Sequence, residues 1–307
     1  MKLSVKNLLT IEELTVEDID LILANAVSFS EILERNLKKV PTLRGKTVAN
    51  LFFEPSTRTR NSFEIAAKRL SADTVNFSAS TSSLKKGESI LDTIDTILAM
   101  RTDLLVIRHA HSGMCKRISD FVDVPIINAG DGKHEHPTQA LLDLYTINKS
   151  KKRLKGLNIA IVGDVLNSRV ARSDVRIFKK MGIDVKIVAP TMLLPESTDF
   201  FGSEICSTID DVIEEVDVLY MLRMQFERQD RKFYPSLEEF NRFLSLDKKR
   251  FQKLKKDSLV MHPGPVNRDI EISDDVMRLD DERILIDEQV TNGVAIRMSL
   301  LYLLLGK

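Results

Sequence analysis

The chain has 307 residues, of which 43% are hydrophobic and 29% are charged. This composition is typical of a soluble globular protein, and the length favours about two domains. The 45 basic and 45 acidic side chains cancel, so the charge balance gives no indication of a nucleic-acid-binding surface. No apolar run reaches the roughly 18 residues that cross a bilayer, and no apolar leader segment precedes Glu12. We therefore expect neither a membrane span nor a secretory signal.

The chain has two cysteines, Cys115 and Cys206, and they do not form a CxxC pair. A disulfide framework or a cysteine-based zinc site is therefore not expected, and a reducing compartment is favoured. Together with the charge and hydropathy, this predicts a cytoplasmic protein.

Short apolar runs alternate with longer amphipathic segments along the first half of the chain. Strands are predicted at residues 46–53, 74–77, 103–108 and 124–128, and helices at residues 59–70, 90–100 and 136–147. The polar, basic segment 148–155 is predicted to be a solvated helix end and linker.

The same alternation then restarts. Strands are predicted at residues 158–162, 185–189, 217–222, 258–261 and 283–286, and helices at residues 169–181, 209–216, 237–254 and 293–305. The last of these helices is apolar nearly all round, so we expect it to pack into a core.

Alternating strands and helices predict parallel sheets that are covered on both faces. The fold class is therefore α/β, with two doubly wound domains and the C-terminal helix packing back on the N-terminal domain. The first domain is predicted to comprise residues 1–147 and 291–307, and the second to comprise residues 148–290.

The segment Glu54-Pro55-Ser56-Thr57-Arg58-Thr59-Arg60 joins the end of a predicted strand to the start of a helix. Ligands of open α/β sheets bind beyond the carboxyl ends of the strands, and a helix N-terminus favours anions. Three hydroxyls and two guanidiniums in five residues are donors suited to a phosphate group. An ordinary helix cap followed by a charged first turn is the alternative, and such a cap needs a single hydroxyl.

Arg108 ends a predicted buried strand and is expected at the same sheet edge, although an isolated arginine there is often a simple surface residue. His109 and His111 form an HxH pair, and His134 and His136 form another. The first pair has no nearby carboxylate or third ligand, and the second is only a weak indication of a metal site, so we expect no metal.

The segment Asn128-Ala129-Gly130-Asp131-Gly132 leads to His136 at a predicted helix start. The glycines permit unusual backbone angles just past the strand. A histidine at a helix start is expected to be neutral and to donate one N–H to a carbonyl oxygen, although it also fits a capping role. The polar segment 82–89 (SSLKKGES) fits either a surface loop or a functional one.

These motifs together resemble those of the carbamoyltransferases: STRTR after a strand, IRH, HPTQ at a helix start, and KGES before an LDT helix. In the second half, GDVLNSR (163–169), RMQ (223–225) and HPGP (262–265) are similar to the catalytic chains of aspartate carbamoyltransferase. The HCLP and SMG motifs of ornithine carbamoyltransferase are absent. The resemblance covers nearly the whole chain.

The resemblance implies a first set of residues, which bind carbamoyl phosphate. The phosphate is assigned to Ser56, Thr57, Arg58 and Thr59, with Arg108. The carbonyl oxygen is assigned to Thr59, Arg108 and His136, which would stabilise the oxyanion of a tetrahedral intermediate. Gln139 would hold the carbamoyl amino group, together with the backbone of Pro263 and Gly264.

A second set is implied for L-aspartate. Arg169 and Arg223 would pair with its two carboxylates, assisted by Gln225. Lys86, with the preceding serine, would reach both substrates from a neighbouring subunit, so a homotrimer with shared active sites is expected. No cofactor is implied, and the departing phosphate is expected to take the amine proton.

Two departures from the best-known bacterial form leave points open. Gly264 replaces a leucine, and the spacing from serine to lysine in the loop is one residue shorter, so either Ser82 or Ser83 is the phosphate contact. Both departures are more similar to forms that work without regulatory chains, although regulatory or pathway-enzyme partners remain open.

Three alternatives to this interpretation fit the sequence less well. Another acceptor such as ornithine needs an acidic pocket, which Arg169 and Arg223 disfavour. A dinucleotide-binding dehydrogenase needs GxGxxG spacing, which the segment after residue 162 lacks. A non-catalytic relative that kept the fold is expected to have lost some site residues, and all of them are present.

Overall fold

The computed structural model describes residues 2–78, 89–225 and 237–306. No helix within these ranges is long and apolar enough to cross a membrane.

The chain divides into two compact units. Unit 1 comprises Met1–Tyr145 and Thr291–Lys307, and unit 2 comprises Thr146–Val290. The first division therefore falls between residues 145 and 146. The sequence pattern predicts it two residues later, between 147 and 148. Two helices, α5 (Pro137–Lys151) and α10 (Ile286–Leu305), run through the divisions.

Unit 1 is built on a parallel four-stranded sheet with the strand order β2-β1-β3-β4. The central strands β1 (Thr47–Phe52) and β3 (Leu104–His109) are flanked by β2 (Asp73–Ser78) and β4 (Ile126–Asp131). Nearly every residue of β1 and β3 is buried, which is typical of parallel strands covered on both faces.

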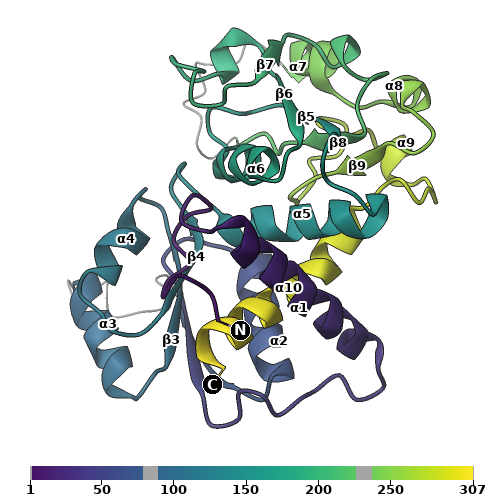
Figure 1. Ribbon diagram of the computed structural model, residues 1–307. Helices are drawn as coiled ribbons and strands as arrows, with labels where there is room; N and C mark the ends of the chain where they lie inside the picture. The colour runs from purple at the N-terminus through teal and green to yellow at the C-terminus, as the bar shows by residue number, and fades with distance from the viewer. Residues whose placement is uncertain (1, 79–88, 226–236, 307) are drawn as a thin grey trace. The chain divides into compact units, whose positions relative to one another are not determined.

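Helices cover both faces of this sheet (Figure 1). One face carries α3 (Ile90–Ala99) and α4 (Met114–Ser119), and the other carries α1 (Val16–Glu34), α2 (Thr57–Arg69) and α10. Side chains from α3, α4, β1 and β3 form one buried apolar cluster on the first face. Alternate strand residues point to the two faces, so both faces of the sheet are apolar.

The C-terminal helix packs against α1 in unit 1. The Ser299 hydroxyl donates to the Ile22 carbonyl at 2.8 Å, and the Tyr302 ring meets the Phe29 ring edge-on at 5.7 Å between centroids. The helix begins at Ile286, seven residues before the predicted start at 293. The predicted packing of this helix on the N-terminal domain is confirmed.

Unit 2 contains a parallel five-stranded sheet with the order β7-β6-β5-β8-β9. The strands are β5 (Asn158–Val162), β6 (Asp184–Val188), β7 (Glu204–Cys206), β8 (Val218–Met221) and β9 (Leu259–Met261). The helices are α6 (Arg169–Lys180), α7 (Leu237–Leu244), α8 (Lys248–Lys253) and α9 (Asp274–Met277). The prediction of two α/β domains with parallel sheets is confirmed.

Several predicted elements differ in detail. The predicted helix 209–216 is a single 3-10 turn, Ile209–Asp211, followed by further turns. The predicted helix 237–254 is broken between α7 and α8, because the backbone of Leu246 pairs with Glu271 and Ser273 instead of continuing the helix. The Asp247 carboxylate then caps α8 by accepting the Arg250 N–H at 2.8 Å.

Two further corrections concern the ends of elements. The predicted strand 283–286 is an isolated bridge between Val260 and Ile284, because helix α10 begins only two residues later. The predicted linker 148–155 is helical as far as Lys151, and the chain turns at Lys152, whose φ is +57°.

Candidate active site

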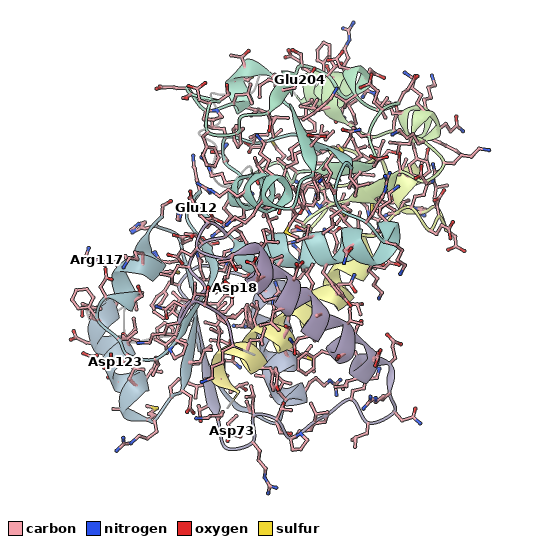
Figure 2. All side chains as sticks on the ribbon, in the orientation of Figure 1. Glu12, Asp18, Asp73, Arg117, Asp123 and Glu204 are labelled. Carbon is pink, nitrogen blue, oxygen red and sulfur yellow. The ribbon has the colours of Figure 1, made fainter. Side chains whose placement is uncertain are left out.

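The carboxyl ends of the strands in unit 1 bring most of the predicted phosphate-binding segments to one sheet edge. Phe52 pairs with Arg108 in the β1–β3 register, and His109 pairs with Asp131 in the β3–β4 register. Asp73, labelled in Figure 2, is the first residue of β2 and so marks the opposite end of the sheet, where the parallel strands begin. The carboxyl edge is where α/β sheets bind their ligands.

The segment after β1 forms the start of α2. Ser56 occupies the N-cap position with extended backbone angles, but its hydroxyl makes no capping hydrogen bond. Thr57 and Arg58 are exposed in the first turn, whereas Thr59 is buried. No acidic residue lies in this turn. Capping therefore does not account for the segment, and its donors and the helix N-terminus suit an anion.

Arg108 lies at the same edge and is held by two neighbours. Its Nε donates to Glu54 Oε1 at 2.9 Å, and its Nη2 lies 2.8 Å from the same oxygen. Its Nη1 donates to the Ala129 carbonyl at 3.3 Å. Both side chains of the ion pair are largely buried, so Arg108 is a fixed residue rather than a mobile surface arginine.

His109 and His111, the first HxH pair, contact each other and neighbouring residues. His109 Nδ1 accepts the His111 backbone N–H at 2.9 Å, and the His109 ring packs against Phe53 at 5.4 Å. Burial, together with the neighbouring His111, lowers the pKa of His109 below its ordinary value of 6.5. Among the residues that the structure describes, no group of three or more His, Cys, Asp or Glu side chains is placed to hold a metal ion.

Asp131 organises the turn that leads to His136. Its carboxylate accepts hydrogen bonds from the Gly113 N–H at 2.6 Å and the Asn128 side chain at 2.9 Å, and contacts His134 Nδ1 at 3.1 Å. Burial acts to raise the pKa of this carboxyl, but the hydrogen bonds outweigh burial and hold the pKa below 3.8. His134 is therefore tied to Asp131.

His136 and Gln139 occupy the start of α5, and both are buried. His136 immediately precedes the first helical residue, and its carbonyl accepts the Gln139 N–H at 2.9 Å. The Gln139 side-chain amide donates through Nε2 to both Asp143 oxygens, at 3.1 and 3.2 Å. The side chain is therefore oriented by the next turn of its own helix.

Unit 2 presents its predicted aspartate-binding residues at the carboxyl edge of its own sheet. Arg169 is the first residue of α6, is 3% exposed, and follows the N-cap Ser168, which accepts the Ala171 N–H at 3.1 Å. Arg223 and Gln225 follow β8. A largely buried guanidinium at a sheet edge is suited to bidentate binding of a carboxylate.

Two buried carboxylates hold the backbone next to Arg223. Glu271 Oε1 accepts the Met224 N–H at 2.7 Å, and Asp164 Oδ2 accepts the Gln225 N–H at 3.3 Å. Both carboxylates are fully buried. They fix the segment 223–225 relative to the loops that follow β5 and β9.

The segment 262–265 follows β9 and turns sharply. Gly264 has a φ of +63°, a conformation that favours glycine, and its N–H donates to His262 Nδ1 at 2.8 Å. The peptide bond between Gly264 and Pro265 is cis. Pro263 and Gly264 are partly exposed.

The predicted loop residues Ser82, Ser83 and Lys86 lie outside the described residues. The other predicted residues fall into two sets. Those of unit 1 are Ser56, Thr57, Arg58, Thr59, Arg108, His136 and Gln139, and those of unit 2 are Arg169, Arg223, Gln225, Pro263 and Gly264.

The sequence motifs did not reveal the acidic residues that hold the candidate site and the turns beside it. Glu54 and Asp131 lie within the motifs, but no role was predicted for either of them. Asp143 and Glu271 were not predicted at all. Asp143 lies four residues after Gln139, a spacing at which helical side chains meet, so this signal was readable in the sequence.

Comparison with known proteins identifies the family. Residues 6–149 match the carbamoyl-phosphate-binding domain of aspartate/ornithine carbamoyltransferases, and residues 155–304 match the Asp/Orn-binding domain of the same family. These two matches span most of the chain and define a carbamoyltransferase. The chain belongs to the aspartate/ornithine carbamoyltransferase family.

Relatives within this family carry a more specific name. The aspartate carbamoyltransferase catalytic subunit of Syntrophus aciditrophicus is 51% identical over 306 residues, covering 100% of this chain and 99% of that protein. Aspartate transcarbamoylase from Trypanosoma cruzi in complex with carbamoyl phosphate and aspartate has a TM-score of 0.88 at 32% identity, covering 98% and 97% of the two chains. The catalytic subunit of M. Jannaschii aspartate transcarbamoylase has a TM-score of 0.85 at 34% identity, covering 98% of each chain.

Proposed function

We propose that this chain transfers the carbamoyl group of carbamoyl phosphate to the amine of L-aspartate. The products are N-carbamoyl-L-aspartate and phosphate, an early step of pyrimidine biosynthesis. The observation that carries the proposal is the start of α2. Hydroxyl and guanidinium donors lie together at this helix N-terminus, which follows the strand that pairs with Arg108. The Ser56 hydroxyl makes no capping hydrogen bond. The names of the full-length relatives give the same activity.

The proposed phosphate site consists of Ser56, Thr57, Arg58 and Thr59 with Arg108. Hydroxyls, guanidiniums and backbone N–H groups together neutralise and orient a dianion. Thr59, Arg108 and His136 are proposed to donate to the carbamoyl oxygen, where negative charge develops. Donors that are already fixed by the fold stabilise that charge without further reorganisation.

The acceptor specificity is proposed to reside in unit 2. Arg169 and Arg223 would each pair with one carboxylate of aspartate, and Gln225 would assist. Ornithine carries a cationic side chain, which two arginines disfavour. The names of the relatives also favour aspartate as the acceptor.

The reaction balances without a cofactor. The aspartate nitrogen attacks the carbamoyl carbon, and the carbonyl electrons move to oxygen to give a tetrahedral oxyanion. Collapse of the oxyanion breaks the bond between carbon and the phosphate oxygen, and the phosphate departs with the bonding pair. The phosphate takes the proton that the nitrogen loses. Holding both substrates in line supplies part of the barrier reduction.

We also propose that the active protein is a cytoplasmic homotrimer. Lys86, with Ser82 or Ser83, would complete the active site of a neighbouring subunit. The homotrimer depends on the sequence resemblance alone, and sedimentation of the purified protein tests it. A sedimentation coefficient that corresponds to a monomer under assay conditions would contradict it.

The experiment that tests the main proposal supplies carbamoyl phosphate with L-aspartate or with L-ornithine in parallel. We expect N-carbamoyl-L-aspartate from the first mixture and no product from the second. Product from ornithine alone would retain the carbamoyl phosphate site and overturn the acceptor assignment. Absence of product in both mixtures, from folded protein, would favour a non-catalytic relative.

A further inference from the structure

Helix α5 contains a buried hydrogen-bonded pair that determines which atom Gln139 presents. Asp143 is fully buried and Gln139 is 8% exposed. Gln139 Nε2 lies 3.1 and 3.2 Å from the two Asp143 oxygens. An ionised carboxylate only accepts hydrogen bonds, so the NH₂ end of the amide must face Asp143. Gln139 Oε1 then faces away from Asp143, and it makes no hydrogen bond to the described part of the chain.

Arg297 provides the charge that favours an ionised Asp143. Arg297 is 4% exposed, and burial lowers its pKa to about 10, while the attraction of Asp143 acts to raise it. The guanidinium therefore keeps its charge at neutral pH. A cation near a buried carboxyl favours the carboxylate form. A protonated Asp143 would donate to Gln139 Oε1 and reverse the amide.

The guanidinium is itself held by two residues of α2 within unit 1. Its Nη1 donates to the Ser62 hydroxyl at 2.9 Å, and its Cζ lies 5.1 Å from the centre of the Phe63 ring. A Cβ atom at Gly293 would lie 2.6 Å from Nη1 and 3.1 Å from the Leu142 side chain, so glycine leaves room for this arrangement. Arg297 thus connects α10 with α2 and α5, the two helices whose first turns carry proposed carbamoyl-phosphate-binding residues.

We propose that Asp143, supported by Arg297, is a positioning residue that makes Gln139 an obligate hydrogen-bond acceptor for the carbamoyl amino group. The inference depends on the proposed function, because it assigns the substrate of the same site. Gln139 Oε1 would accept an N–H of the carbamoyl NH₂ group. A ligand with a methyl group in that place offers no such donor, and a buried acceptor left unmatched costs binding. Asp143 therefore determines specificity for carbamoyl phosphate over acyl phosphates.

The test compares carbamoyl phosphate with acetyl phosphate, which replaces the amino group with a methyl group. Dissociation constants are measured by calorimetry for the full chain and for Asp143→Asn. Asparagine keeps the shape but can present either a donor or an acceptor, so Gln139 is free to reverse. We expect the affinity for carbamoyl phosphate to fall about tenfold, which corresponds to roughly 1.4 kcal/mol. The affinity for acetyl phosphate should change less than about twofold.

Three further proteins sharpen the test. Asp143→Ser removes the carboxylate with a smaller side chain, and serves if Asp143→Asn does not fold. Gln139→Met removes the amide, and adding Asp143→Asn to it should then leave the ratio of the two affinities unchanged. Asp20→Asn makes the same chemical change at an exposed position of α1 and should alter neither affinity.

The outcomes separate the two proposals. Equal weakening of both ligands in the Asp143 variants would mean a merely structural role and would overturn the positioning inference. An unchanged ratio with unchanged affinities would overturn it as well. If the unmodified chain bound both ligands equally, the positioning inference would fail while the proposed function would stand. If it bound neither ligand, the proposed function itself would fail, and the inference would fail with it.

Discussion

Two nitrogens of the Arg108 guanidinium contact one oxygen of Glu54, at 2.9 and 2.8 Å. A phosphate that binds Arg108 must compete with this carboxylate. Glu54→Gln removes the competing charge, so we expect carbamoyl phosphate to bind about threefold to tenfold more tightly. Calorimetric titration measures the effect, with Glu17→Gln at an exposed position of α1 as the control. Weaker binding in Glu54→Gln would show that Glu54 positions Arg108 more than it competes.

The pH dependence of stability should include a contribution from Asp131. Its pKa in the folded chain is lowered below 3.8, so its stabilising effect is complete above the unfolded pKa and is lost as pH falls through the folded pKa. Asp131→Asn should lower the free energy of unfolding by about 1–3 kcal/mol at pH 7. The loss relative to the unmodified chain should shrink below about pH 4, as urea unfolding at both pH values can show. A loss that stays constant with pH would contradict the assigned charge.

The apolar core of unit 1 should be sensitive to lost volume. Ile107 is fully buried in the central strand β3. Ile107→Ala removes methyl groups that the surrounding side chains cannot replace, so we expect a loss of about 2–5 kcal/mol in the free energy of unfolding. Ile65→Ala, at a position that is 43% exposed, should cost less than about 1 kcal/mol. Equal losses in chemical denaturation would contradict the assigned burial.

Glu271 should affect aspartate binding without contacting aspartate. Its carboxylate accepts the Met224 N–H at 2.7 Å and the Asn267 N–H at 2.6 Å, and so holds the backbone beside Arg223. Glu271→Gln replaces one acceptor with a donor, and we expect the KM for aspartate to rise about tenfold or more. The dissociation constant for carbamoyl phosphate should stay within about twofold. Glu214→Gln, an exposed change in the same unit, is the control, and a similar loss of carbamoyl phosphate binding would refute local positioning.

The hydrophobic pattern predicted most of the fold because both sheets are parallel and buried. Residues 104–107 and 159–162 are apolar throughout, and they lie within β3 and β5. The helix α1 was missed although Thr15 and Asp18 form a capping box before it. The break at Leu246 was not predictable from local pattern, since it depends on backbone pairing with Glu271 and Ser273.

The sequence predicted those candidate site residues that lie within short contiguous motifs. Arg58 and Arg169 stand at helix starts that follow strands, and the structure places both there. The carboxylates that hold Arg108, Gln139 and the backbone beside Arg223 were harder to foresee. Glu271 reaches Met224 across 47 positions of sequence, and only the folded chain brings the two together.

The central claim is that the chain carbamoylates L-aspartate with Arg58 at the phosphate and Arg223 at the acceptor. The most direct test measures labelled N-carbamoyl-L-aspartate formed from labelled carbamoyl phosphate by the unmodified chain, Arg58→Ala and Arg223→Ala. We predict steady product formation by the unmodified chain and losses of at least about 100-fold in kcat/KM in both variants. A folded, unmodified chain that forms no product, or two variants that form it at an undiminished rate, would contradict the account.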